Sequence, residues 1–210
     1  MNITTNKTAG SKPPAPRMVY AAMGLAMAVL LIGAGAFLWL TGGGNGNGGM
    51  GIGGPFTLED GAGKSVTERD FRGKYMLVYF GYTNCPDVCP TTLNAVADGL
   101  DKLGPKAKEI VPIFITVDPK RDTAPVVKQY AAAFGPSFVG LTGSADEIQT
   151  VAKEYRVYYA EHKTGPGPND YAMDHSSVLY LMDTKGNFIA PMRADQTGDE
   201  MAANLRKLLG

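Results

Sequence analysis

The sequence predicts an α/β domain in which helices pack around a central sheet. Apolar runs of strand length recur from residue 55 onward, stretches with apolar residues at helical spacing alternate with them, and a hairpin pattern lies near the C-terminus. The chain has 210 residues, which is enough for one such domain with attached segments. We therefore expect a folded domain at residues 55–210 and separate segments before it.

Local patterns predict each element of this domain. Residues 56–67 alternate in polarity around an Asp-Gly turn, which is typical of an N-terminal hairpin. Ser144 and Glu147 form a capping-box pattern at the start of a helix. In chain order, the sequence predicts a hairpin at 56–67, a strand at 75–80, a helix at 90–103, a strand at 110–117, a helix at 126–134, a strand at 138–141, a helix at 145–154, a strand at 155–160, a loop at 163–170, a hairpin of strands at 176–183 and 187–192, and a helix at 199–209.

The N-terminal residues have the features of a transmembrane anchor. Residues 19–40 contain no charged side chain, and as one helix they would extend about 33 Å, enough to cross a hydrocarbon core of about 30 Å. Three basic residues precede this stretch and the next one is Lys64, so the positive-inside rule places residues 1–18 in the cytoplasm. A cleaved signal peptide with a small-residue site at 34–36 is the alternative, but the apolar stretch exceeds the usual h-region.

Residues 41–54 contain nine glycines and two asparagines, which is the composition of a flexible linker. Residues 1–18 do not resemble a mitochondrial transit peptide. We therefore expect a single-pass protein of the bacterial plasma membrane, the inner membrane, whose domain at 55–210 faces the periplasm. That domain has no run of basic residues, so we expect no nucleic-acid partner.

Both cysteines of the chain lie in one strand-to-helix turn at residues 81–91. Cys85 and Cys89 each precede a proline, which disfavours the helical region for both. Cys89 is therefore expected to be the N-cap of a helix that starts at Pro90. A thiol in that position faces unpaired backbone N–H groups and the positive end of the helix dipole, which favour its thiolate.

Such a pair of thiols supports two kinds of chemistry. A structural disulfide would close a very short loop and stabilise the fold by only about 2 kcal/mol, so we expect thiol–disulfide exchange or metal binding instead. A metal ion would need a third ligand, and the chain has two histidines. His175 precedes the strand expected at 176–183 and converges on the cysteine turn if the strands are parallel, whereas His162 is expected at the surface. Two thiolates and one imidazole suit copper in both oxidation states, and also zinc.

Three motifs of the chain resemble those of one known family. Residues 81–90 match Gly-Tyr-Thr-x-Cys-Pro-Asp-x-Cys-Pro, residues 117–123 match Val-Asp-Pro-x-Arg-Asp-Thr, and Asp174-His175 matches an Asp-His pair before a strand. With these motifs in this order, the chain resembles the Sco/SenC copper chaperones, which act in cytochrome c oxidase assembly.

The resemblance implies a thioredoxin-like fold and a copper ion, as Cu(I) or Cu(II), bound by Cys85, Cys89 and His175. It implies a metallochaperone that delivers copper to the copper A site of cytochrome c oxidase subunit II, or that reduces the cysteines of that site. Other copper chaperones and thioredoxin-like reductants are further implied partners. We also expect Asp118 to neighbour the site and Asp174 to orient the imidazole, as carboxylates commonly do for ligating histidines.

The alternative is an extracytoplasmic thiol–disulfide oxidoreductase or peroxidase on the same fold, with Cys85 and Cys89 as catalytic residues. Thioredoxin-like redox motifs have two residues between the cysteines, whereas this chain has three, and it has His175-Ser176 where those proteins have a proline. Copper ligation and disulfide formation use the same thiolates, so one site can combine both activities. The sequence leaves open whether the protein is an enzyme.

Overall fold

The computed structural model describes residues 51–210. The tail expected at 1–18, the anchor expected at 19–40 and most of the linker expected at 41–54 lie outside the described residues. At the start of the described part, the N–H of Gly53 donates a hydrogen bond of 2.8 Å to the carbonyl of Glu154, so the end of the expected linker lies against the domain. Across residues 51–210, every helix is too short or too polar to cross a membrane.

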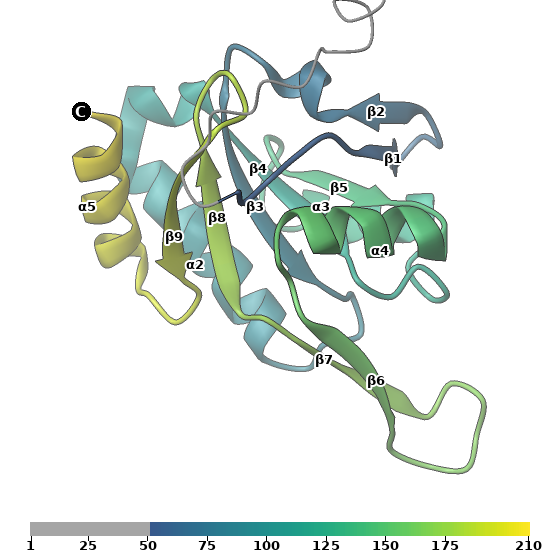
Figure 1. Cartoon of the computed structure of the whole chain (residues 1–210). Coiled ribbons are helices and arrows are strands. Elements are labelled where there is room, and N and C mark those ends of the chain that lie inside the picture. The colour runs from purple at the N-terminus through teal and green to yellow at the C-terminus, as the bar shows by residue number, and fades with distance from the viewer. Residues whose placement is uncertain (1–50) are drawn as a thin grey trace, which may run out of the picture. The chain divides into compact units, whose positions relative to one another are not determined.

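Seven strands form the central sheet of the domain (Figure 1). They are β1 (Thr57–Asp60), β2 (Ser65–Thr67), β3 (Tyr75–Gly81), β4 (Ile110–Thr116), β5 (Val139–Thr142), β8 (Val178–Met182) and β9 (Phe188–Arg193). Their order across the sheet is β2–β1–β5–β4–β3–β8–β9. The strand β3 is central, since it pairs in parallel with β4 on one side and antiparallel with β8 on the other.

Helices cover both faces of this sheet. They are α2 (Val88–Leu103), α3 (Ala124–Ala132), α4 (Ala145–Glu154) and α5 (Gly198–Leu209), with short 3-10 helices η1 (Glu68–Phe71) and η2 (Gly104–Glu109). Figure 1 shows α2 and α5 side by side on one face and α3 with α4 on the other. The close approach of α2 to α5 requires a glycine at position 99, because a Cβ there would lie only 2.6 Å from the Cγ of Met201.

The core is centred on β3. Val78, Tyr79 and Phe80 have no exposed surface. A strand that is covered by helices on both faces is expected to be continuously apolar rather than alternating, which explains the unbroken apolar run in this part of the sequence. The buried strand expected at 75–80 is therefore confirmed, and the cysteine turn follows directly from the centre of the domain.

Most of the expected elements are confirmed. The N-terminal hairpin is formed by β1 and β2. At the start of α4, the N–H of Ser144 donates to the Glu147 carboxylate and the N–H of Glu147 donates to the Ser144 hydroxyl, as the capping-box pattern predicts.

The strand expected at 155–160 is wrong at its start. Tyr155 is the C-cap of α4 and is buried in the core, so the chain becomes extended only after it. The strand in this region is β6 (Tyr159–Lys163), and it pairs antiparallel with β7 (Tyr171–His175), which the sequence analysis did not predict. These two strands form a separate two-stranded sheet.

Candidate metal centre

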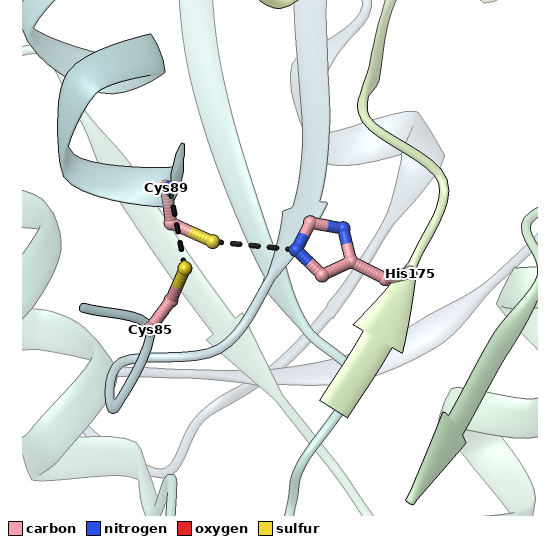
Figure 2. Close-up of side chains that lie close together, drawn as sticks. All are labelled: Cys85, Cys89 and His175. Atoms are coloured by element: carbon pink, nitrogen blue, oxygen red, sulfur yellow. Dashed lines mark hydrogen bonds between the residues drawn. The ribbon is translucent and has the colours of Figure 1, made fainter. Parts of the chain in front are cut away.

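Cys85, Cys89 and His175 lie together at the end of the sheet where the central strand β3 ends (Figure 2). Cys85 lies in the loop after β3, Cys89 is the second residue of α2, and His175 is the last residue of β7. Their ligand atoms, two sulfurs and one ring nitrogen, all lie within 4.8 Å of one another. Within residues 51–210, these are the His, Cys, Asp and Glu side chains that are grouped closely enough to hold a metal ion.

His175 reaches the cysteine turn because β8 is antiparallel to β3. The expectation that parallel strands bring these residues together is therefore wrong. The start of an antiparallel strand meets the end of its neighbour, and Leu179 near the start of β8 lies opposite Tyr79 near the end of β3. His175, just before β8, is thereby placed beside the turn that follows β3.

The helix after the cysteine turn begins earlier than expected. The first residue of α2 is Val88 and its N-cap is Asp87, so the expectation that Cys89 caps a helix starting at Pro90 is wrong. Pro90 is compatible with this because a proline is tolerated anywhere in the first helical turn, where its missing N–H has no intrahelical partner. The sulfur that lies at the helix N-terminus is that of Cys85, which accepts the N–H of Cys89 at 3.4 Å.

Cys89 is the buried thiol of the site. It has no exposed surface, and its sulfur lies 3.4 Å from Nε2 of His175 and 3.9 Å from the hydroxyl of Tyr79. A Cβ at Gly81 would lie 2.8 Å from this sulfur, so the glycine makes room for it. Burial raises the pKa of the Cys89 thiol to about 12, so the activated thiolate expected at Cys89 is wrong for the metal-free protein. A metal ion that binds there displaces the thiol proton.

The His175 ring is held in an orientation that suits metal binding. Nδ1 lies 3.3 Å from the carbonyl oxygen of Ser176, so we assign the ring proton to Nδ1 and the free lone pair to Nε2. Burial lowers the pKa of His175, which keeps the ring neutral at neutral pH. The rings of Tyr79 and Tyr82 stand edge-on to the imidazole, with centroids 6.0 and 6.1 Å away. A neutral imidazole with a free nitrogen that faces two sulfurs is a metal-ligand arrangement.

The donor set fits a soft or borderline metal ion. Metal–sulfur bonds of about 2.3 Å and metal–nitrogen bonds of about 2.0 Å separate the ligand atoms of a three-coordinate ion by roughly 3.5 to 4 Å. The observed separations, which reach at most 4.8 Å, need only small side-chain adjustments to match this. Two thiolates and an imidazole suit copper and zinc.

The two carboxylates expected beside the site have other contacts. The Asp174 side chain is 64% exposed and pairs with Nδ1 of His162 at 3.3 Å, so its expected role in orienting the imidazole is wrong, and the Ser176 carbonyl takes that place. Successive residues of a strand point to opposite faces, which turns Asp174 away from the site. Asp118 contacts Arg121 and Tyr171. His162 is half exposed, as predicted.

Asp122 supports the site and was not identified from the sequence. Its carboxylate is fully buried and accepts the backbone N–H of Thr83 at 2.9 Å, the Thr83 hydroxyl at 2.6 Å and the Thr116 hydroxyl at 2.6 Å. Thr83 lies two residues before Cys85, so these bonds tie the cysteine turn to the end of β4. Its place in the motif at 117–123 was the available signal, but its partner in the cysteine turn, Thr83, is 39 residues away in the chain.

Replacing Asp122 with alanine is expected to lower the free energy of unfolding by about 3 kcal/mol, because three donors in or near the core lose their acceptor. Urea unfolding followed by circular dichroism measures this change. The control is Asp195→Ala, which removes an exposed carboxylate paired with Arg193 and is expected to change little. Equal stability of the two variants would contradict the assigned role of Asp122.

The two thiols are expected to differ in reactivity in the metal-free protein. Cys85 is partly exposed, whereas Cys89 is buried and has a raised pKa, so alkylation at Cys89 should be slower by about tenfold or more at pH 8. Iodoacetamide labelling followed by peptide mass spectrometry measures both rates. The same measurement in denaturant should give similar rates, and equal rates in the folded protein would contradict the buried position of Cys89.

The fold and the site together define an α/β domain with a Cys-Cys-His group at the end of the central strand of its sheet. The family model described as SCO1/SenC matches residues 45–210. The chain is 48% identical over 139 residues to "Protein SCO1 homolog 1, mitochondrial" of Arabidopsis thaliana, which is 66% of this chain and 41% of that protein. The chain therefore belongs to the SCO1/SenC family, and it spans less than half of the length of this relative.

Solved structures support the same assignment. The crystal structure of Arabidopsis thaliana ScoI with copper bound is 42% identical and superposes with a TM-score of 0.70, covering 75% of this chain and 98% of that one. The structure of Bradyrhizobium japonicum ScoI with copper bound is 45% identical with a TM-score of 0.68, covering 75% and 99%. The predicted thioredoxin-like α/β fold is thereby confirmed.

Proposed function

We propose that this protein is a copper-binding metallochaperone of cytochrome c oxidase assembly. The observation that carries the proposal is the group formed by Cys85, Cys89 and His175, whose ligand atoms lie within 4.8 Å of one another. The donor set alone is compatible with copper and zinc. Copper is favoured because the Sco relatives in the two compared structures have copper bound and share the fold of this chain.

In this proposal copper is cargo, and the chain delivers it to the copper A site of cytochrome c oxidase subunit II. Residues 19–40 anchor the protein in the bacterial plasma membrane, and residues 41–54 tether the domain on the periplasmic side, close to an integral membrane partner. Other copper chaperones supply the ion, and thioredoxin-like reductants keep the thiols reduced. These roles follow from the composition of residues 1–54 and from the family resemblance.

A thiol–disulfide reductase activity is the second candidate, and it rests on the two free thiols of the site. Cys85 is partly exposed and lies close to Cys89, as an attacking thiol and its resolving partner must. The same two sulfurs bind metal in the main proposal, so copper loading and disulfide formation exclude each other.

Metal analysis of the full chain tests the proposal. Purified in mild detergent, reduced and mixed with Cu(II) without oxygen, the protein should retain one copper after desalting, show a sulfur-to-copper charge-transfer band and protect both thiols from a thiol reagent. Zinc in equal amount should not displace the copper. Absence of retained copper, or oxidation of both thiols to a disulfide with two Cu(II) ions reduced to Cu(I) and two protons released, would favour the redox alternative.

A deletion strain tests the role in oxidase assembly. Loss of the protein is expected to lower cytochrome c oxidase activity in membranes, and copper added to the medium is expected to restore part of it, because excess copper bypasses a delivery step. Oxidase activity that stays normal under copper limitation would contradict delivery.

A further inference from the structure

The hairpin that carries His175 lies outside the central sheet. The strands β6 and β7 form their own two-stranded sheet, and Figure 1 shows this hairpin extending away from the main sheet. His175 is the last residue of β7, so the position of its ring depends on how the hairpin is held. The contacts between the hairpin and the rest of the domain therefore bear on the metal centre.

Arg121, in the loop between β4 and α3, holds the start of β7. Its Nη1 donates hydrogen bonds to the carbonyl oxygen of Tyr171 at 2.9 Å and to that of Asn169 at 3.3 Å. Its guanidinium carbon lies 3.6 Å from the centroid of the Tyr171 ring. Tyr171 is the first residue of β7, so Arg121 fixes the strand at the end opposite to His175.

Asp118 completes this arrangement. Its carboxylate is only 3% exposed, forms an ion pair with Nε of Arg121 and accepts the hydroxyl of Tyr171 at 2.8 Å. A buried carboxylate needs such partners, so the three side chains hold one another in place. We refer to Asp118, Arg121 and Tyr171 as the clasp.

The clasp also reaches His175 through an aromatic ring. The guanidinium carbon of Arg121 lies 5.8 Å from the centroid of Tyr82, and Tyr82 stands edge-on to the imidazole of His175 at an interplanar angle of 84°. Nη2 of Arg121 is buried and has no hydrogen-bond partner within residues 51–210, and these two tyrosine rings lie beside the guanidinium. A planar guanidinium can stack on rings and donate a fork of hydrogen bonds at the same time, whereas a lysine ammonium cannot.

We propose that Arg121 is a positioning residue for His175. It fixes the start of β7 through Tyr171 and supports the ring of Tyr82 that packs against the imidazole, so that Nε2 faces the two sulfurs. The inference rests on the proposed function, because it treats His175 as a copper ligand. Arg121 does not touch the metal in this proposal and acts only through the position of the histidine.

A double-mutant cycle tests this role. The variant Arg121→Lys keeps a positive charge beside Asp118 but loses the fork and the stacking. In the full chain, it is expected to lower Cu(II) affinity about 10- to 100-fold, as loss of a partner that orients a ligating histidine does. In a His175→Ala background, the same substitution is expected to leave the remaining affinity unchanged, since the histidine through which Arg121 acts is gone. An equal loss in both backgrounds would overturn the inference.

The matched control is Lys120→Met. Lys120 lies on the same loop and also contacts the hairpin, through an ion pair of 3.4 Å with Glu161 and with its Nζ 5.6 Å from the centroid of the Tyr171 ring, but it is 74% exposed. It is expected to leave copper affinity within about twofold of the parent. If Arg121→Lys is unfolded in thermal scans, Arg121→Gln replaces it, because a glutamine amide can still donate a hydrogen bond to the Asp118 carboxylate but cannot reproduce the stacking on Tyr171 and Tyr82. Parent-like copper affinity in the replacement variant would then overturn the inference.

A metal-free readout separates this inference from the proposed function. The ring protons of His175 lie near the edges and faces of Tyr79 and Tyr82 and should show ring-current shifts in NMR spectra. Arg121→Lys is expected to change these shifts and to speed amide exchange in β7, and unchanged ring signals would overturn the positioning role. If the parent binds no copper but Arg121→Lys still changes the His175 ring shifts, the proposed function is refuted and Arg121 remains a positioning residue for His175.

Discussion

Serine at both cysteine positions is expected to abolish copper binding and leave the fold intact. In the variant Cys85→Ser/Cys89→Ser, the two soft thiolate ligands become hydroxyls that stay protonated at neutral pH, so His175 alone remains as a good ligand. Copper retained after desalting should fall from one ion per chain to none, and the sulfur-to-copper charge-transfer band should disappear.

The fold should tolerate this change because each new hydroxyl finds a partner. The oxygen at position 85 can accept the backbone N–H that now points to the sulfur of Cys85. The buried hydroxyl at position 89 lies beside His175 and Tyr79, so it is not left without a hydrogen bond. Thermal unfolding of the metal-free proteins checks this, and a melting temperature close to that of the parent is expected.

Copper binding that survives both serine substitutions would contradict the three-ligand site. A folded double-serine variant that still holds one copper as tightly as the parent would mean that the ion binds elsewhere, for example at methionines, and the three-ligand site would be wrong. The single variant Cys85→Ser keeps the pair of Cys89 and His175, whose atoms lie 3.4 Å apart, and is expected to bind copper more weakly than the parent but measurably.

The sequence predicts those parts of the fold that depend on neighbouring residues. The strand β3 is buried because it lies between two helical layers. A strand in that position needs a continuous apolar run, and residues 75–80 show such a run directly in the sequence. The capping box of Ser144 and Glu147 is equally local, and it marks the start of α4 correctly. The two cysteines are also close in sequence, so their proximity follows from chain geometry alone.

Long-range effects account for what the sequence analysis missed at the cysteine turn. A proline before or within the first turn is compatible with several helix starts, so the start of α2 at Val88 could not be distinguished from a start at Pro90. The raised pKa of Cys89 comes from burial, and burial depends on how β3 and α2 pack. The helix N-terminus acts on Cys85 instead, which local spacing alone did not indicate.

The hairpin of β6 and β7 was missed for a different reason. It lies outside the central sheet, and residues 159–163 are partly or fully exposed, so no alternation of apolar and polar residues marks the strand. The residues that hold it, Asp118 and Arg121, contact Tyr171 across about 50 positions of the chain. The motif at 117–123 drew attention to these residues, but only the structure gives their partners.

The histidine variants separate metal binding from thiol chemistry. Loss of a residue that only orients a ligating histidine typically lowers metal affinity about 10- to 100-fold. His175→Ala is expected to lower copper affinity by more than this, because it removes the ligand itself. Copper competition titrations measure the affinity, and nitrogen hyperfine coupling in the Cu(II) EPR spectrum should vanish. His175→Phe gives a stricter version, since it keeps a ring between Tyr79 and Tyr82 but has no nitrogen.

His162→Ala is the matched control, because His162 is the other histidine of the chain, lies on the same hairpin and, within residues 51–210, forms its ion pair with the exposed Asp174. It should bind copper like the parent. The variants His175→Ala, His175→Phe and His162→Ala all keep Cys85 and Cys89. If those thiols alone carry a disulfide reductase activity, each variant should reduce a small disulfide substrate at a rate near that of the parent. Copper affinity that survives His175→Ala and His175→Phe would remove the histidine from the site. The two thiols would then be better explained as a redox pair than as part of a three-ligand copper centre.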